Sequence, residues 1–138
     1  MRYLGMLLAI GACTSIDTQQ QYLSVDVTEG YAILDDPVEG SHFGVTILVS
    51  GPVAASTPTA VAWFAHQYEP IANDIPMTAG DQTWSDGGRI YAFNNAPPAE
   101  LHDWCDQVVV IEVQLTGTMA DGHVEGSGGS TATVVNCN

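Results

Sequence analysis

The sequence predicts an all-β protein, most simply a small antiparallel β-sandwich of about six to eight strands. Apolar residues recur at every second position along most of the chain, which is the period of a half-buried strand and not of a helix. Turn residues such as Gly, Pro and Asp separate these alternating runs. The Cys–Trp–Cys spacing of immunoglobulin domains is absent, so the likeness to them is architectural only. A small β-barrel is the alternative arrangement of the same strands.

The expected strands are short and follow one another along the chain after residue 21. In chain order they are 22–28, 42–50, 60–67, 89–94, 107–116 and 131–136, with a weaker strand at 31–34. In the third of them Val61, Trp63 and Ala65 share one face, which predicts that Trp63 points into the core. The first half of 107–116 is apolar on both faces, so we expect both to be buried there.

The segments between the expected strands contain fewer recognisable sequence patterns. The Asp-Gly pair at 121–122 predicts a tight hairpin turn after the longest strand. The glycine-rich stretch 125–130 is expected to be a loop before the last strand. A single helical turn is expected over 97–104, because prolines stand at its start and acidic residues follow early. Its Leu101 and Trp104 would then cap one end of the core.

The first thirteen residues indicate export. Arg2 precedes an apolar run, 4–12, that is too short for a membrane-spanning helix of about 20 residues but fits a secretory signal. The run ends in Ile-Gly-Ala-Cys at 10–13, which resembles the lipobox of bacterial lipoproteins. The resemblance implies that 1–12 is a signal peptide and that Cys13 receives a diacylglycerol and becomes the N-terminus. An ordinary cleaved signal, or a buried N-terminal strand, is the alternative.

The same resemblance implies a location. Residues 13–21 are polar and would form a lipidated tether of at most about 26–29 Å, followed by a single domain over 22–138. The protein would be exported and anchored to a membrane through the lipid on Cys13. Thr14, and not Asp, follows the cysteine, which favours the outer membrane or cell surface if the host is Gram-negative.

Three cysteines are an odd number for an exported protein. Lipidation of Cys13 would leave Cys105 and Cys137, and an oxidising compartment favours a disulfide between them. A metal site is the competing interpretation, because His102 stands three residues before Cys105. No second closely spaced pair of ligands supports this interpretation, so we predict no metal centre.

The charge of the chain is strongly acidic. Sixteen acidic residues face two basic ones, a formal net charge of −14, and loss of the signal peptide would leave Arg89 as the single full positive charge. Nucleic-acid binding is therefore excluded, and electrostatic docking to anionic lipid is disfavoured. Solubility, above all in a salty habitat, accounts for the acidity. Binding of cations or of a basic partner is the alternative, although the acidic residues are scattered.

The function is only weakly indicated. No catalytic or phosphate-binding motif is present, so we predict no enzyme. A membrane-anchored domain with a structural or protein-interaction role is the leading hypothesis. The alternative is a glycan- or calcium-binding module centred on a long loop at 68–88, where Trp84 would grip a ligand beside Asp81 and Asp86. Against this role, Trp84 would instead fold back over the core.

Overall fold

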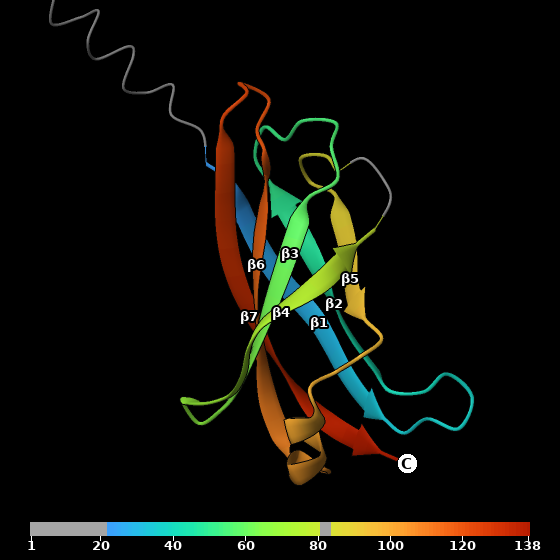
Figure 1. Cartoon of the computed structure of the whole chain (residues 1–138). Helices are drawn as coiled ribbons and strands as arrows, with labels where there is room; N and C mark the ends of the chain where they lie inside the picture. Colours follow the sequence, from blue (N-terminus) through green and yellow to red (C-terminus); the bar gives the residue numbers. More distant parts are fainter. Residues whose placement is uncertain (1–21, 81–83) are drawn as a thin grey trace, which may run out of the picture.

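The computed structural model describes residues 22–80 and 84–138, so the predicted signal peptide, the predicted tether with Cys13, and Asp81 lie outside the described residues. Within this part, seven strands form one closed barrel in the order β1-β2-β5-β4-β3-β6-β7 (Figure 1). The elements are β1 (Ser24–Leu34), β2 (His42–Ser50), β3 (Thr59–His66), β4 (Glu69–Ala79), β5 (Arg89–Asn94), the 3-10 helix η1 (Ala99–Trp104), β6 (Val108–Thr118) and β7 (Val124–Cys137). The all-β class is confirmed, and the barrel is the arrangement left open beside the sandwich.

Closure of the barrel depends on one parallel pairing. Every other neighbouring pair of strands is antiparallel, whereas Ala32–Leu34 of β1 runs parallel to Val135–Cys137 of β7. The longest pairing is the β6–β7 hairpin, whose register runs from Val108 opposite Val134 to Thr118 opposite Val124. This confirms the turn predicted at 121–122.

The core fills the inside of the barrel. Each strand turns one face inward, as the alternating burial of β2 illustrates. The aromatic rings of Phe43 on β2 and Phe64 on β3 meet edge to face, with centroids 4.9 Å apart, and both side chains are fully buried. The two strands are not neighbours in the sheet, so this contact spans the interior.

The two ends of the barrel are closed by different residues. The helix η1 lies at the end of the barrel near the C-terminus (Figure 1). Its Leu101 is fully buried, as the predicted capping role requires. Trp104 is partly buried against the core, and its ring lies 4.4 Å from that of His66, centroid to centroid. At the other end Trp84 is buried beside Gly117 of β6. The predicted helical turn is thus present as a short 3-10 helix.

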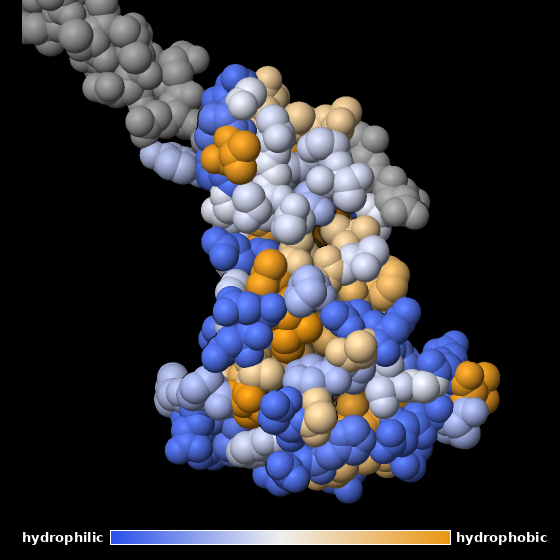
Figure 2. Space-filling model, viewed as in Figure 1, coloured by the Kyte–Doolittle hydropathy of each residue, from blue (hydrophilic) through white to orange (hydrophobic). Residues whose placement is uncertain are grey.

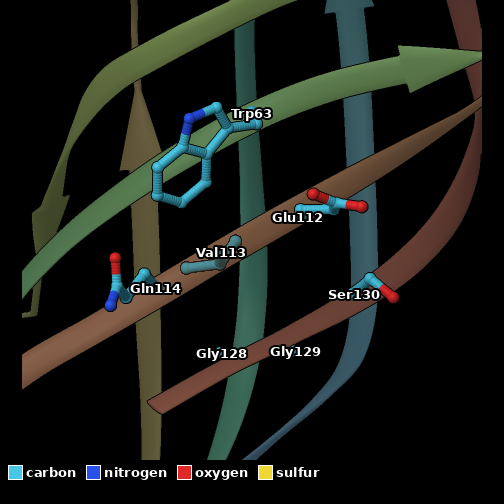
Figure 3. A pocket seen from close by; sticks show the side chains of 7 residues that line it. All are labelled: Trp63, Glu112, Val113, Gln114, Gly128, Gly129 and Ser130. Carbon is cyan, nitrogen blue, oxygen red and sulfur yellow. The ribbon is translucent and has the colours of Figure 1, made fainter. Parts of the chain in front are cut away.

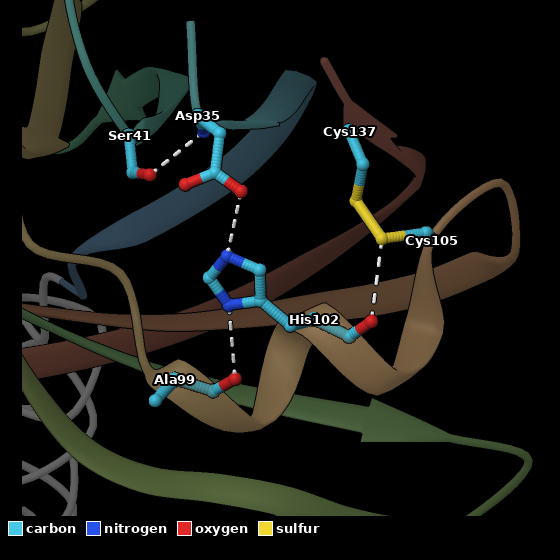
Figure 4. The surroundings of a disulfide bond; sticks show 6 residues. All are labelled: Asp35, Ser41, Ala99, His102, Cys105 and Cys137. Atoms are coloured by element: carbon cyan, nitrogen blue, oxygen red, sulfur yellow. Dashed lines mark hydrogen bonds and ion pairs between the residues drawn. A yellow bond between two sulfur atoms is a disulfide. The ribbon is translucent and has the colours of Figure 1, made fainter.

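The disulfide predicted between Cys105 and Cys137 is present (Figure 4), with sulfurs 1.98 Å apart. It ties the end of β7 to the residue that follows η1. The metal-site interpretation is wrong because the Cys105 sulfur is bonded to another sulfur. His102 instead bonds Asp35 through Nε2 at 2.9 Å and the Ala99 carbonyl through Nδ1 at 3.1 Å. The bond to Asp35 raises the pKa of His102.

The long loop predicted over 68–88 is wrong, because Glu69–Ala79 forms β4. Its sequence hides the alternation, since Pro70 and Pro76 interrupt it and Asp74 has a left-handed φ of 55°. Such residues are tolerated in a strand that lacks a partner along most of one edge. Among the residues that the structure describes, β4 pairs with β5 at two register positions, Thr78 with Phe93 and Ala79 with Ala92. Figure 2 shows apolar residues reaching the surface among polar ones in the narrow middle of the molecule, where β3 and β4 cross in Figure 1.

The glycine-rich stretch 125–130 is also strand and not loop, since it belongs to β7. The weaker strand at 31–34 joins the first one, and a bulge between Val27 and Glu29 separates the two runs. Glycine lacks the side chain that makes strands recognisable, so pairing with β6 decides the conformation of 125–130. No helix of the described part is long and apolar enough to cross a membrane.

Candidate functional site

The binding role predicted for Trp84 is wrong. Its side chain is only 3% exposed, and Nε1–H donates a hydrogen bond to Ser56 Oγ at 3.1 Å. Asp86 is also engaged within the protein, because one of its oxygens accepts a hydrogen bond from the Gly51 backbone N–H at 2.8 Å. These contacts hold the end of the barrel closed, which is the alternative that the sequence raised. The third predicted residue, Asp81, lies outside the described residues.

Histidines and acids do not gather into a metal centre in residues 22–80 and 84–138, where no group of three or more His, Cys, Asp or Glu side chains has suitable geometry. The four histidines are spread over the barrel, and each bonds the protein. His42 and His66 contact backbone carbonyls, His102 bonds Asp35, and His123 bonds two carboxylates. The calcium prediction involved Asp81, so it stays a prediction.

A groove on the outer wall of β3, β6 and β7 is the strongest candidate site in the described part. Trp63 on β3 is paired with Glu112 on β6, and Glu112 is paired with Ser130 on β7. The next row holds Gln114 opposite Gly128. Opposed residues of antiparallel strands project from the same face of the sheet. The register therefore brings an indole, a carboxylate, an amide and a hydroxyl together.

The groove is shallow and open, with a volume of about 380 Å³. Figure 3 shows the Trp63 ring over β3, with Glu112 and Gln114 on the neighbouring strand β6 and Ser130 farther away on β7. Gly128 leaves the floor of the groove without a side chain. We call this set of residues the Trp63 groove.

The polar groups of the Trp63 groove are available to a ligand. Within the described part, neither the Glu112 carboxylate nor the Gln114 amide forms a hydrogen bond with another residue. A carboxylate accepts hydrogen bonds, an amide both donates and accepts, and a tryptophan face packs against C–H groups. This combination matches a ligand with hydroxyls around its edge and an apolar face, and a sugar ring has that shape.

Sequence reasoning missed the Trp63 groove because it assigned the two faces of β3 in reverse. Ala60, Ala62 and Phe64 are the buried residues, whereas Trp63 is only partly buried and faces outward. Both faces of this strand are apolar, so the periodicity of the sequence does not indicate which face points into the core. The space inside the barrel decides, because small alanines leave room for the Phe43–Phe64 pair. An apolar second face on β3 is the signal that was available.

No protein-family model matches the chain, and no curated protein is significantly similar to it.

Proposed function

We propose that this protein is a glycan-binding domain that is exported and held at a membrane by a lipid on Cys13. The observation that carries the binding role is the Trp63 groove, where an outward tryptophan lies in one row with Glu112 and Ser130. The sequence predicts a glycan site at 68–88, but Trp84 is buried there, so we assign the glycan site to the Trp63 groove instead.

The charge of the chain narrows the class of glycan. The formal net charge is −14, and Glu112 itself lines the groove. Uronic acids and sulfated sugars would be repelled, so neutral sugars are the expected ligands. A single shallow groove also supports weak binding of one or two sugar rings and not enclosure of a whole ligand.

The anchor rests on the lipobox resemblance at residues 10–13. β1 begins at the end of the barrel opposite η1 (Figure 1), so the tether would join the barrel at that end. The Trp63 groove lies on the side wall of the barrel, where a membrane at the tethered end would leave it accessible.

A protein-interaction role is the second candidate. Two large apolar side chains project from turns: Val38 between β1 and β2 is 89% exposed, and Tyr68 between β3 and β4 is fully exposed. Exposed apolar residues at loop tips are common contact points for partner proteins. This role would leave the Trp63 groove without a ligand.

The test is an array of neutral and acidic glycans probed with the full-length protein in detergent. We expect binding to neutral glycans and a loss of about tenfold or more in Trp63→Ala, equivalent to about 1.4 kcal/mol. Trp63→Phe should restore part of the binding because it retains an aromatic face. Val38→Ala and Tyr68→Ala serve as matched surface controls that leave binding unchanged. A blank array, or binding that survives Trp63→Ala, would reject the glycan proposal and favour the protein-interaction role.

A further inference from the structure

A second hollow lies on the outer wall formed by β1, β2 and β5, away from the Trp63 groove. Three aromatic residues and a histidine line it: Tyr31, His42, Tyr91 and Phe93. The carboxylate of Glu39 closes one side, and the volume is about 580 Å³. We call this set of five residues the tyrosine hollow.

The rings form a continuous wall. Tyr31 on β1 and Tyr91 on β5 are nearly parallel, with an interplanar angle of 14° and centroids 6.3 Å apart, and their hydroxyls are hydrogen-bonded to each other. Phe93 continues the wall, 5.7 Å from Tyr91 at 21°. His42 stands at an angle of 63° to Tyr31, with centroids 5.5 Å apart. The hollow is therefore bordered by three nearly parallel rings and by the His42 ring, which is steeply inclined to that of Tyr31.

The absence of a side chain at Gly44 makes room for the Tyr31 ring. Gly44 of β2 lies between Tyr31 and Phe93 in the sheet register. A Cβ at residue 44 would come within 2.7–2.9 Å of the Tyr31 ring and hydroxyl, so the ring crosses β2 directly over this glycine. The wall is therefore formed before any ligand arrives, which reduces the entropy lost on binding.

We propose that the tyrosine hollow binds an organic ammonium ion whose nitrogen carries methyl groups. The faces of aromatic rings carry partial negative charge and attract cations, most strongly when the cation is poorly hydrated. Methyl groups on nitrogen lower hydration and also pack against the rings. This proposal is independent of the glycan proposal, because the two sites share no residue.

Charge complementarity identifies the ligand as a cation. The Glu39 carboxylate lines the hollow, and the chain as a whole is strongly acidic. Glu39 lies 3.6 Å from His42 Nε2, which places its carboxylate beside the ring wall. Burial and the hydrogen bond to Tyr91 raise the pKa of Tyr31, so this hydroxyl stays protonated and neutral. The Glu39 carboxylate and the acidity of the chain would repel an anionic ligand.

A neighbouring hollow shows why the site is on this side of the tyrosine pair. That hollow also contains Tyr31 and Tyr91 but lacks Phe93 and His42. Each of the two hollows is lined by one carboxylate, that of Glu29 in the neighbour and that of Glu39 in the tyrosine hollow, so charge does not distinguish them. The rings of Phe93 and His42 distinguish the tyrosine hollow, which offers a cation four rings where the neighbour offers two. The cation is therefore expected beside Glu39 and Phe93.

The test compares choline with 3,3-dimethylbutan-1-ol, which has the same shape but no charge. Both are titrated into the full-length protein in detergent, and binding is followed by calorimetry and by tyrosine fluorescence. We expect choline to bind at least tenfold more tightly than the neutral alcohol. Tyr91→Leu should abolish the difference, Tyr91→Phe should keep most of it, and Glu39→Gln should weaken choline binding severalfold.

Trp63→Leu is the matched control, and it should leave choline binding unchanged. A melting curve of each variant shows that the barrel remains folded. Equal affinity for choline and the alcohol would overturn the proposal and show a merely apolar hollow. Absence of choline binding, or choline binding that Tyr91→Leu leaves intact, would overturn it as well. Neither result bears on the glycan array, so failures of the two proposals are distinguishable.

Discussion

The indole of Trp84 lies so close to Gly117 that a Cβ at residue 117 would be 2.3 Å from Trp84 Cζ2. The glycine therefore makes room for the tryptophan that closes the barrel opposite η1. This one contact explains why Trp84 has no binding surface. It also explains why the penultimate residue of β6 is a glycine.

Gly117→Ala should destabilise the protein by about 1–3 kcal/mol, because the added methyl group displaces a buried ring. Urea unfolding of the full-length protein measures the effect. Gly128→Ala is the matched control: its Cβ would have only an ordinary contact, 3.4 Å from the Val113 carbonyl. An unchanged midpoint for Gly117→Ala would contradict the packing of Trp84. In a Trp84→Ala background the added methyl group should cost much less, because the ring that it displaces is gone.

The orientation of β3 predicts opposite results at neighbouring positions. Phe64→Ala should cost about 3–5 kcal/mol, since it leaves a cavity beside Phe43 inside the barrel. Trp63→Leu should cost less than about 1 kcal/mol, because Trp63 lies on the outer wall. Denaturant unfolding of both variants decides between the two faces. The reverse order of the two losses would show that Trp63 is the core residue.

The disulfide should stabilise the closure of the barrel. Its sulfurs join residues 32 positions apart, and one of them is in the β7 segment that pairs with β1. Replacing both cysteines, Cys105→Ser with Cys137→Ser, should lower the free energy of unfolding by about 2–4 kcal/mol. Hydrogen exchange should accelerate first at Ala32–Leu34. A reducing agent should reproduce this effect in the natural chain and add nothing in the double variant; equal exchange rates would refute the role of the bond.

The β6–β7 turn contains a pH-dependent contact. Hydrogen bonds to Glu125 and then to Asp121 raise the pKa of His123 above 6.5. The pKa of Asp121 is lowered below 3.8, chiefly by the His123 backbone N–H, and the bond to His123 lowers that of Glu125 below 4.5. Glu125 also accepts a hydrogen bond from Leu23 N–H at 2.6 Å, so the contact ties the turn to the residue that precedes β1.

The signs of these shifts define a pH window. The contribution of His123 is complete below pH 6.5 and is lost as the pH rises through its raised value, whereas those of the carboxylates are complete above 4.5 and are lost on acidification. The melting temperature of His123→Gln should therefore differ most from that of the natural chain between pH 4.5 and 6.5. A difference that is constant from pH 3 to 9 would contradict the contact. Adding Glu125→Gln to the variant should remove the pH dependence that comes from Glu125, and leave that of Asp121, whose bond from the backbone N–H of residue 123 remains.

Much of the fold followed from local patterns. Period-2 alternation placed β2, β5 and β6 within a residue or two, and an Asp-Gly pair marked the β6–β7 turn. Export chemistry and an odd number of cysteines predicted the bond between Cys105 and Cys137. These signals are local or depend on counting, so they survive without knowledge of the tertiary structure.

Local patterns did not predict β4 or the glycine-rich first half of β7. Pro70 and Pro76 conceal a strand that is unpaired along most of one edge, and glycines conceal the strand at 125–130. In both cases the neighbouring strand, β3 or β6, supplies the hydrogen bonds that the local sequence does not favour. Tertiary context overrode propensity there.

The sequence by itself determined the strand period, the acidity and the cysteine pairing, because each is a property of neighbouring residues or of composition. Only the tertiary structure decided that the sheet closes by pairing β1 with β7, which are the first and last strands in the sequence. It also decided that Trp84 is buried, whereas Trp63 is only partly buried and faces outward. Both faces of β3 are apolar, and the limited volume inside the barrel selects the smaller side chains and turns the indole outward.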